Sequence, residues 1–338
     1  MLIVSACSKT APSENKPPAD DKPAEPKATA VDAGPGAIRA PGPTTVVPTK
    51  PARPSLANRC VLGGDPLAGS CSAYNEGIAV GRDGLLYVVA GKQVRRYQRL
   101  EGADCRLEPS GEPIEMPADN PRPQEVGKGP IYMRSGGSEW RMLRAGDAIY
   151  AHDFLGGLFR IDRGKPEPVC DVFGYSMLAA FGKKLVIARQ GFEELKLGKK
   201  CKEHKLGIDD KARGDVYAIR DHLYLANGKR LTRYDGKTPV ELLEDKQVCY
   251  VSSLAACGDG LCVLDQNCVQ IIQLGPDGKL LRKIDDDQLF ATRPYGMNHI
   301  VAADNGNVYI RAKHRDSTNN KEICETAIYE LPAAVFAH

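Results

Sequence analysis

The sequence has little of what usually builds helical folds or common catalytic centres. Amphipathic helical periodicity is scarce beyond residue 57, and no GxSxG elbow, HExxH motif or phosphate-binding loop occurs. Histidine is rare, with six residues in a chain of 338. These absences argue against a mostly helical protein and against the serine-hydrolase, zinc-protease and nucleotide-binding classes that those motifs mark.

Charge of one sign and long apolar runs are also lacking. The chain holds 46 basic and 43 acidic residues, a net charge of +3, so it offers no electrostatic footprint for nucleic acid. No run approaches the roughly 18 apolar residues that a membrane-spanning helix needs. We therefore expect no nucleic-acid partner and no spanning helix in this sequence.

Aromatic residues are absent from residues 8–57, which instead hold eleven of the 24 prolines. Such a segment cannot bury enough apolar surface to offset the entropy of ordering it. Proline keeps a chain extended, at about 3.1 Å per residue. We expect a disordered, proline-rich tether over residues 8–57, followed by a folded domain over residues 58–338.

A cysteine precedes this tether in the motif "VSAC", Val4–Cys7. The motif resembles the lipobox of bacterial lipoproteins, in which small residues precede a cysteine that receives the lipid. The resemblance implies that Cys7 is lipidated, that residues 1–7 are the remnant of a signal peptide whose start lies upstream, and that the protein is anchored in the cell envelope. Ser8 resembles the residue that directs lipoproteins to the outer membrane. The alternative is a cytosolic protein with a chance match.

Ten cysteines remain beyond Cys7, and an even number in an oxidising compartment predicts up to five disulfides. The folded part also repeats a unit of short apolar strands separated by Gly, Asp and Asn turns. Its second strand supplies one anchor per copy: Tyr87, Tyr150, Val186, Tyr224, Cys262 and Tyr309. The anchors are 63, 36, 38, 38 and 47 residues apart, a spacing typical of β-propeller blades.

The stretch "GIAVGRDGLLYV" at residues 77–88 resembles the repeat of NHL-like six-bladed propellers. We expect an all-β propeller of six blades, because one blade cannot bury both faces of its sheet alone. A seventh blade would have to lie within residues 100–140. A β-sandwich or two smaller β-domains are the alternatives.

The repeat also suggests which cysteines pair. Two of them flank the turn "GDGL" of one hairpin, and others lie at matching ends of strands. The predicted pairs are Cys60–Cys71, Cys105–Cys324, Cys170–Cys201, Cys249–Cys268 and Cys257–Cys262. An alternative uses Cys257, Cys262 and Cys268 as thiolate ligands of a metal, although the spacing lacks a CxxC motif.

Propellers place function at the central channel. Lactonase-type six-bladed enzymes hold a divalent metal there in a cage of carboxylates and asparagines. The oxygen ligands of equivalent residues would suit Ca²⁺. The candidates in this sequence are Glu76, Asp153, Asp265 and Asn298. The alternative is that such residues cap turns at strand ends. His152 and His299 are candidate general bases, or ordinary strand-end residues.

One surface segment is strongly basic. It carries Lys196, Lys199, Lys200, Lys202 and Lys205 within residues 194–205, and could meet an acidic partner or anionic lipid. The alternative is a loop whose lysines protect a strand edge. Because no catalytic residues stand out, we expect a membrane-anchored binding or scaffolding propeller for a protein or envelope polymer, without a cofactor. The alternative is a periplasmic metal-dependent hydrolase of lactonase type.

Overall fold

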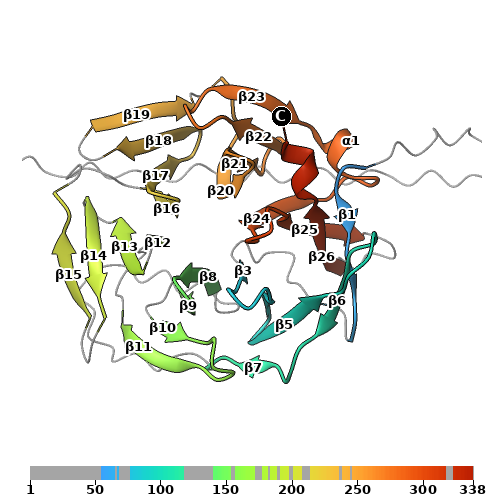
Figure 1. The fold of residues 1–338 in the computed structure, drawn as a ribbon, viewed down its shortest axis with the longest axis horizontal. Helices are drawn as coiled ribbons and strands as arrows, with labels where there is room; N and C mark the ends of the chain where they lie inside the picture. Colours follow the sequence, from blue (N-terminus) through green and yellow to red (C-terminus); the bar gives the residue numbers. More distant parts are fainter. Residues whose placement is uncertain are drawn as a thin grey trace, which may run out of the picture. The chain divides into compact units, whose positions relative to one another are not determined.

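The computed structural model shows a ring of β-sheets around one axis (Figure 1). It describes residues 55–337 with the exception of 65–66, 68–76, 118–139, 154–156, 172–176, 182, 189–190, 198–200, 208–213, 236–237, 244–245 and 317–322. Cys7 and the predicted tether up to residue 54 lie outside the described residues.

The described residues form six sheets, which we number as blades 1 to 6 in chain order. The strands of blades 1 to 3 are β3 (Ile78–Val80), β4 (Leu86–Ala90), β5 (Gln93–Arg99), β6 (Arg106–Pro109) and β7 (Ile114–Glu115); β8 (Trp140–Ala145), β9 (Ala148–Asp153), β10 (Gly157–Arg160) and β11 (Glu167–Asp171); and β12 (Met177–Phe181), β13 (Lys184–Ala188), β14 (Phe192–Lys196) and β15 (Lys202–Lys205).

Blades 4 to 6 repeat the arrangement, and each blade's first strand lies innermost. Their strands are β16 (Asp215–Ile219), β17 (His222–Asn227), β18 (Arg230–Asp235) and β19 (Thr238–Leu243); β20 (Val251–Cys257), β21 (Gly260–Asp265), β22 (Gln270–Leu274) and β23 (Leu280–Ile284); and β24 (Gly296–Ala302), β25 (Val308–Asp316) and β26 (Ile323–Leu331), completed by the N-terminal β1 (Asn58–Arg59). The six-bladed prediction is confirmed, and each predicted anchor residue lies in the second strand of its blade.

Helix is confined to the one-turn α1 (Asp286–Leu289) and the 3₁₀ turn η2 (Ala333–Phe336) within the described part of the chain. None of the helices described there has the length and apolarity to cross a membrane. Short turns join the first and second strands. In blade 1, Asp83 accepts a hydrogen bond from the Leu85 N–H at 3.0 Å, and Gly84 adopts a positive φ that favours glycine.

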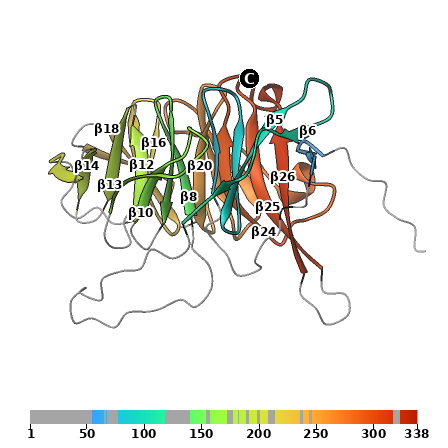
Figure 2. The same cartoon turned by 90° about the horizontal axis from the view of Figure 1, so that it is seen from below.

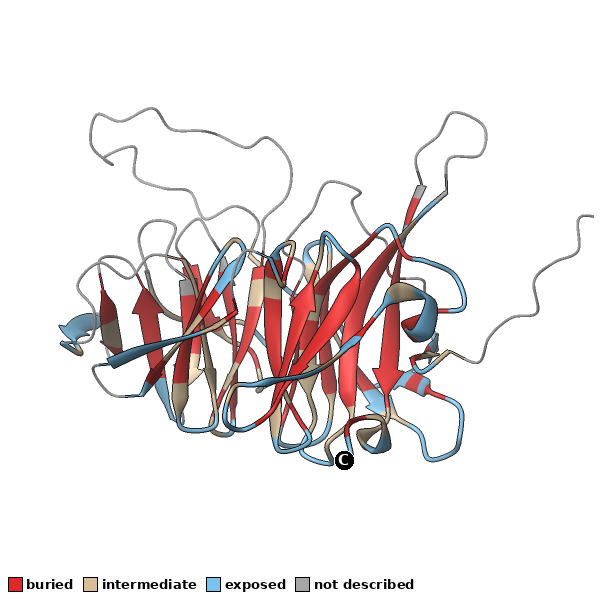
Figure 3. Cartoon of the chain, turned by 90° about the horizontal axis from the view of Figure 1, so that it is seen from above, coloured by how far each residue is buried: buried red, intermediate tan, exposed pale blue. Residues whose placement is uncertain are grey.

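The hydrophobic core is divided among the six boundaries between neighbouring blades. Each buried cluster takes residues from two adjacent blades, such as Val89 with Trp140 between blades 1 and 2, and Ile271 with Ile310 between blades 5 and 6. Figure 3 shows the buried residues along the strands and the exposed ones at the turns and outer strands. Stacking around the ring thus buries both faces of each sheet. This need to bury both faces is the reason why the sequence predicted a propeller.

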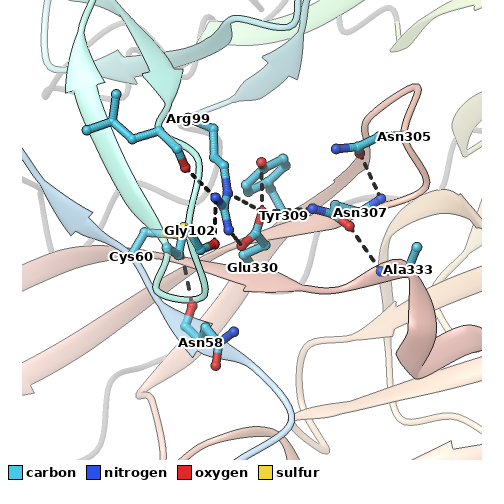
Figure 4. A network of polar contacts seen from close by, with 11 residues as sticks. Asn58, Cys60, Arg99, Gly102, Asn305, Asn307, Tyr309, Glu330 and Ala333 are labelled. Carbon is cyan, nitrogen blue, oxygen red and sulfur yellow. Dashed lines mark hydrogen bonds and ion pairs between the residues drawn. A yellow bond between two sulfur atoms is a disulfide. The ribbon is translucent and has the colours of Figure 1, made fainter.

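The ring closes where the N-terminal segment joins blades 6 and 1. Strand β1 pairs with β26 of blade 6, and β2 (Val61–Leu62) pairs in parallel with β6 of blade 1. Between them, Cys60 forms a disulfide with Cys105, with a Cα–Cα distance of 4.4 Å. The same boundary contains a polar network (Figure 4), in which Arg99 of blade 1 binds both carboxylate oxygens of Glu330 at 2.9 and 3.0 Å.

Three predicted disulfides are present, namely Cys170–Cys201, Cys249–Cys268 and Cys257–Cys262. The predicted pairs Cys60–Cys71 and Cys105–Cys324 are wrong, because the parallel pairing of β2 with β6 brings Cys60 beside Cys105. Cys324 is also disulfide-bonded, and none of the other described cysteines is its partner. The thiolate metal site is wrong as well, since Cys257, Cys262 and Cys268 all form disulfides.

Candidate functional site

The two faces of the propeller are distinguished by the direction of the inner strands. We call the face where these strands begin the start face, marked by Trp140, Asp215 and Gly296, and the opposite one, with the turns at residues 81–85 and 258–259, the turn face. Strands β25 and β26 extend beyond the other blades on the start face, and the C-terminus lies on the turn face (Figure 2).

The inner strand β8 of blade 2 sends two arginines to blades that are not its neighbours. Arg144 binds Asp304 of blade 6 through two hydrogen bonds of 2.8 and 3.0 Å near the turn face. Arg141 donates to the Val216 carbonyl of blade 4 at 3.3 Å, nearer the start face. Two side chains of one strand therefore reach past the adjacent blades and tie blade 2 to the blades two places away on either side.

Around Arg141 lies a group of polar side chains that we call the channel cluster: Arg141, Asp215, Tyr217, Tyr250 and His299. The Arg141 guanidinium lies 4.9 Å from the centre of the Tyr217 ring and 3.9 Å from a carboxylate oxygen of Asp215. Tyr217 donates to the Ser252 carbonyl of blade 5 at 2.8 Å. The cluster thus draws on blades 2, 4, 5 and 6.

Burial changes the acid–base properties of this cluster. It raises the pKa of Asp215, which the Arg141 charge lowers in part. Burial, followed by the charges of Arg141, Arg311 and Lys313, lowers the pKa of His299 to about 3. His299 is therefore neutral at physiological pH, and its buried Nε2 has no hydrogen-bond partner among the described residues.

Of the four predicted metal ligands, the structure describes the side chains of Asp265 and Asn298, and hydrogen bonds already occupy the Asp265 carboxylate. Asp265 is fully buried and accepts hydrogen bonds from the N–H groups of Cys249, Tyr250 and Cys268 at 2.8, 2.9 and 3.3 Å, and from the Gln270 amide at 2.8 Å. Four donors occupy both carboxylate oxygens, which is the turn-capping role. Asn298 is buried on β24 of the next blade. Glu76 and the Asp153 side chain lie outside the described residues.

The two candidate histidines occupy different places. His299 lies on an inner strand, within the channel cluster. His152 is fully buried on the second strand β9, opposite Arg141 in the β8–β9 pairing. The sequence singled out His299, but it gave no sign of Arg141, because arginines on strands look like ordinary surface residues until the blades are placed.

The basic segment lies at the outer edge of blade 3. Lys196 ends β14, and Lys202 and Lys205 belong to β15, all of whose residues are exposed. Lys199 and Lys200 lie outside the described residues. Glu193 and Glu203 are cross-strand partners of Lys205 and Leu195, so acidic residues are interspersed with the lysines. An anionic partner for this edge remains a prediction.

Comparison with known proteins gives structural neighbours only. No protein-family model matches the sequence, and no curated protein does. A selenomethionine-substituted virginiamycin B lyase from Staphylococcus aureus is 12% identical, with a TM-score of 0.48 over 79% of this chain and 87% of the lyase.

Two further neighbours are BamB from Moraxella catarrhalis and a chain of a Nidogen/Laminin complex. BamB is 11% identical (TM-score 0.37, 75% of this chain and 81% of BamB), and the latter chain is 15% identical (TM-score 0.45, 72% and 92%). Such low identities and TM-scores carry no inference about function.

Proposed function

We propose that this chain is an envelope lipoprotein, anchored through a lipid on Cys7, whose propeller binds a protein or envelope polymer on its start face. The observation that carries the proposal is that two exposed tyrosines directly precede inner strands on the start face. Tyr250 precedes β20 and is 40% exposed, and Tyr295 precedes β24 and is 58% exposed. Tyrosine and arginine are enriched at protein interfaces, and Arg315 lies 5.3 Å from the centre of the Tyr295 ring.

The surroundings of these tyrosines favour binding over catalysis. The Cys249–Cys268 disulfide and the four hydrogen bonds to Asp265 hold the segment that carries Tyr250. A contact surface held in place loses little entropy on binding. Arg141 and Arg144 likewise fix the distances from blade 2 to blades 4 and 6. One of the carboxylates that the enzyme alternative would use, that of Asp265, already accepts four hydrogen bonds.

Site-specific photocrosslinking tests the proposal. A photoreactive phenylalanine analogue at position 250 or 295 in the native envelope should crosslink to a distinct partner. Leu281, 44% exposed on the outer strand β23, is the matched control position and should not yield that product. Identical products at all three positions, or none at 250 and 295, would reject the start face as the binding surface.

Localisation has a separate test. Mass spectrometry of the protein from its native envelope should find an acylated Cys7, and a Cys7→Ala variant should be released from the membrane fraction. Equal retention of the variant would reject the anchor while leaving the binding surface untouched.

A further inference from the structure

The disulfide beside Tyr250 is the most exposed of those whose two cysteines the structure describes. Cys268 is exposed and its partner Cys249 is half-buried. The cysteines of the other three pairs are half-buried or buried, namely Cys170–Cys201, Cys60–Cys105 and Cys257–Cys262. Because reduction of a disulfide requires a thiolate to reach one of its sulfur atoms, Cys249–Cys268 is the pair most open to attack.

Cys268 lies in the loop at residues 266–269, which joins β21 to β22 on the start face. The ladder between these strands ends at the pair of Asp265 with Gln270, so the loop lies beyond the last paired residues of the sheet. Asn267, next to Cys268, is also exposed. Two consecutive exposed residues in a hairpin loop leave room for a reductant as large as a protein dithiol.

The same loop is strained at Val269, the residue after Cys268. Val269 has a φ of 53°, in the left-handed region that β-branched residues avoid and glycine adopts readily. Its side chain is buried in the core between blades 5 and 6, while the disulfide holds the preceding residue. These two restraints keep the backbone in a conformation that it would otherwise leave. Opening the S–S bond removes one of them, which favours reduction of this pair.

Hydrogen bonds also hold the two cysteine-bearing segments together, independently of the S–S bond. Asp265 accepts the N–H groups of Cys249 and Cys268 at 2.8 and 3.3 Å, and the Gln266 N–H donates to the Tyr250 carbonyl at 3.1 Å. A carboxylate oxygen of Asp265 and the two Sγ atoms all lie within 4.8 Å of one another. The thiols formed by reduction therefore stay side by side, and the disulfide can form again without unfolding of the blade.

We propose that Cys249–Cys268 is a site of reversible thiol–disulfide exchange with a dithiol reductant, and that the strained loop favours its opening. One thiolate of the dithiol attacks the Cys268 Sγ, and the Cys249 sulfur leaves with the electron pair and takes up a proton. The second thiolate of the dithiol then displaces Cys268, which takes up a proton in turn. The protein gains two electrons and two protons, and the dithiol becomes a disulfide. This inference goes beyond the proposed binding function and does not depend on it.

Partial reduction of the native, full-length protein tests the site. The protein is treated with dithiothreitol, a small dithiol, without denaturant, and the thiols formed are alkylated at intervals and located by peptide mapping. Cys249 and Cys268 should be alkylated roughly tenfold faster than Cys170 and Cys201, the half-buried control pair, while the circular dichroism spectrum stays native. A rate no faster than that of the control pair, or loss of the native spectrum in step with the reduction of Cys249–Cys268, would overturn the proposal.

A variant of the loop tests the contribution of strain. In Val269→Gly the backbone adopts the positive φ without strain, so the equilibrium with dithiothreitol should shift about threefold toward the protein disulfide. Val335→Gly is the matched control, because it removes a side chain packed against the same core without changing the loop, and it should leave this equilibrium as in the wild type. No shift in Val269→Gly, or an equal shift in both variants, would overturn the proposed role of strain.

Discussion

Asp265 organises the start-face end of blade 5 through its two carboxylate oxygens. Because both oxygens accept N–H groups, replacing one by an NH₂ group in Asp265→Asn sets donor against donor. We expect a loss of about 1–3 kcal/mol, the cost of buried unsatisfied polar groups, in the free energy of unfolding from chemical denaturation. Asp259→Asn, at an exposed turn of the same blade, should change it by less than about 0.5 kcal/mol.

Calcium distinguishes this capping role from the metal-ligand alternative. If Asp265 only caps the turn, added Ca²⁺ should change the Tm of the wild type and of Asp265→Asn by the same amount. A Tm that rises with Ca²⁺ in the wild type and not in Asp265→Asn would show that the carboxylate exchanges its N–H donors for the ion.

Sequence alone left the role of this residue undecided for a physical reason. An aspartate at a strand end caps a turn or binds a metal depending on which N–H groups converge on it. Those groups come from Cys249 and Tyr250, which precede β20, and from Cys268 and Gln270, which follow β21. Their convergence depends on the hairpin geometry and on the Cys249–Cys268 disulfide, neither of which appears in local sequence patterns.

The strands β1 and β2 have only two residues each, but they close the ring. They join blade 6 to blade 1, and the Cys60–Cys105 disulfide fixes the junction. The chain-entropy estimate for a separation of 45 residues is about 4 kcal/mol, against about 2 kcal/mol for the separation of 5 in Cys257–Cys262.

We therefore expect Cys60→Ser/Cys105→Ser to lower the free energy of unfolding by about twice as much as Cys257→Ser/Cys262→Ser. Denaturant melts of the two double variants, both without reductant, compare them directly. A larger loss in the hairpin variant would show that the ring junction is held chiefly by its other contacts.

The other contacts at this junction include the Arg99–Glu330 pair, which gives a pH prediction. Glu330 is buried, and although burial acts to raise its pKa, the hydrogen bond and charge of Arg99 outweigh it and hold the pKa below the usual 4.5. The folded carboxyl is thus the stronger acid. Its contribution to stability is complete above about pH 4.5 and is lost as the pH falls through the lower folded value.

Arg99→Ala leaves the Glu330 charge buried without its cationic partner, with only the neutral donors Asn307 and Tyr309, at an expected cost of about 3–5 kcal/mol at pH 7. The difference from wild type should shrink as Glu330 becomes protonated between about pH 5 and pH 3. Melts of both proteins across this range test it, with Arg163→Ala, whose pair with Glu167 is exposed, as the control. A difference that stays constant with pH would assign the cost of Arg99→Ala to lost packing.

At the scale of the whole molecule, the sequence repeat made the propeller fold predictable. The contacts between blades that are distant in sequence could not be predicted. The apolar second strands recur at blade spacing, so residues such as Tyr150 and Tyr224 mark the blades in the sequence itself. The parallel β2–β6 pairing that closes the ring has no local signature in the sequence. The arginine ties of the channel were missed, since they join blades that are distant in sequence.

The chain has an odd number of cysteines, so at least one of them cannot form a disulfide within the chain. All nine cysteines in the described residues are disulfide-bonded, eight of them to one another and Cys324 to a partner elsewhere. The chain has eleven cysteines, and the remaining two are Cys7 and Cys71. Alkylation of the denatured, unreduced protein should therefore modify one cysteine at most, and peptide mapping should find it to be Cys7 in a chain without lipid. Modification of Cys71 instead would mean that Cys324 pairs with Cys7, which would leave no thiol at the predicted lipidation site.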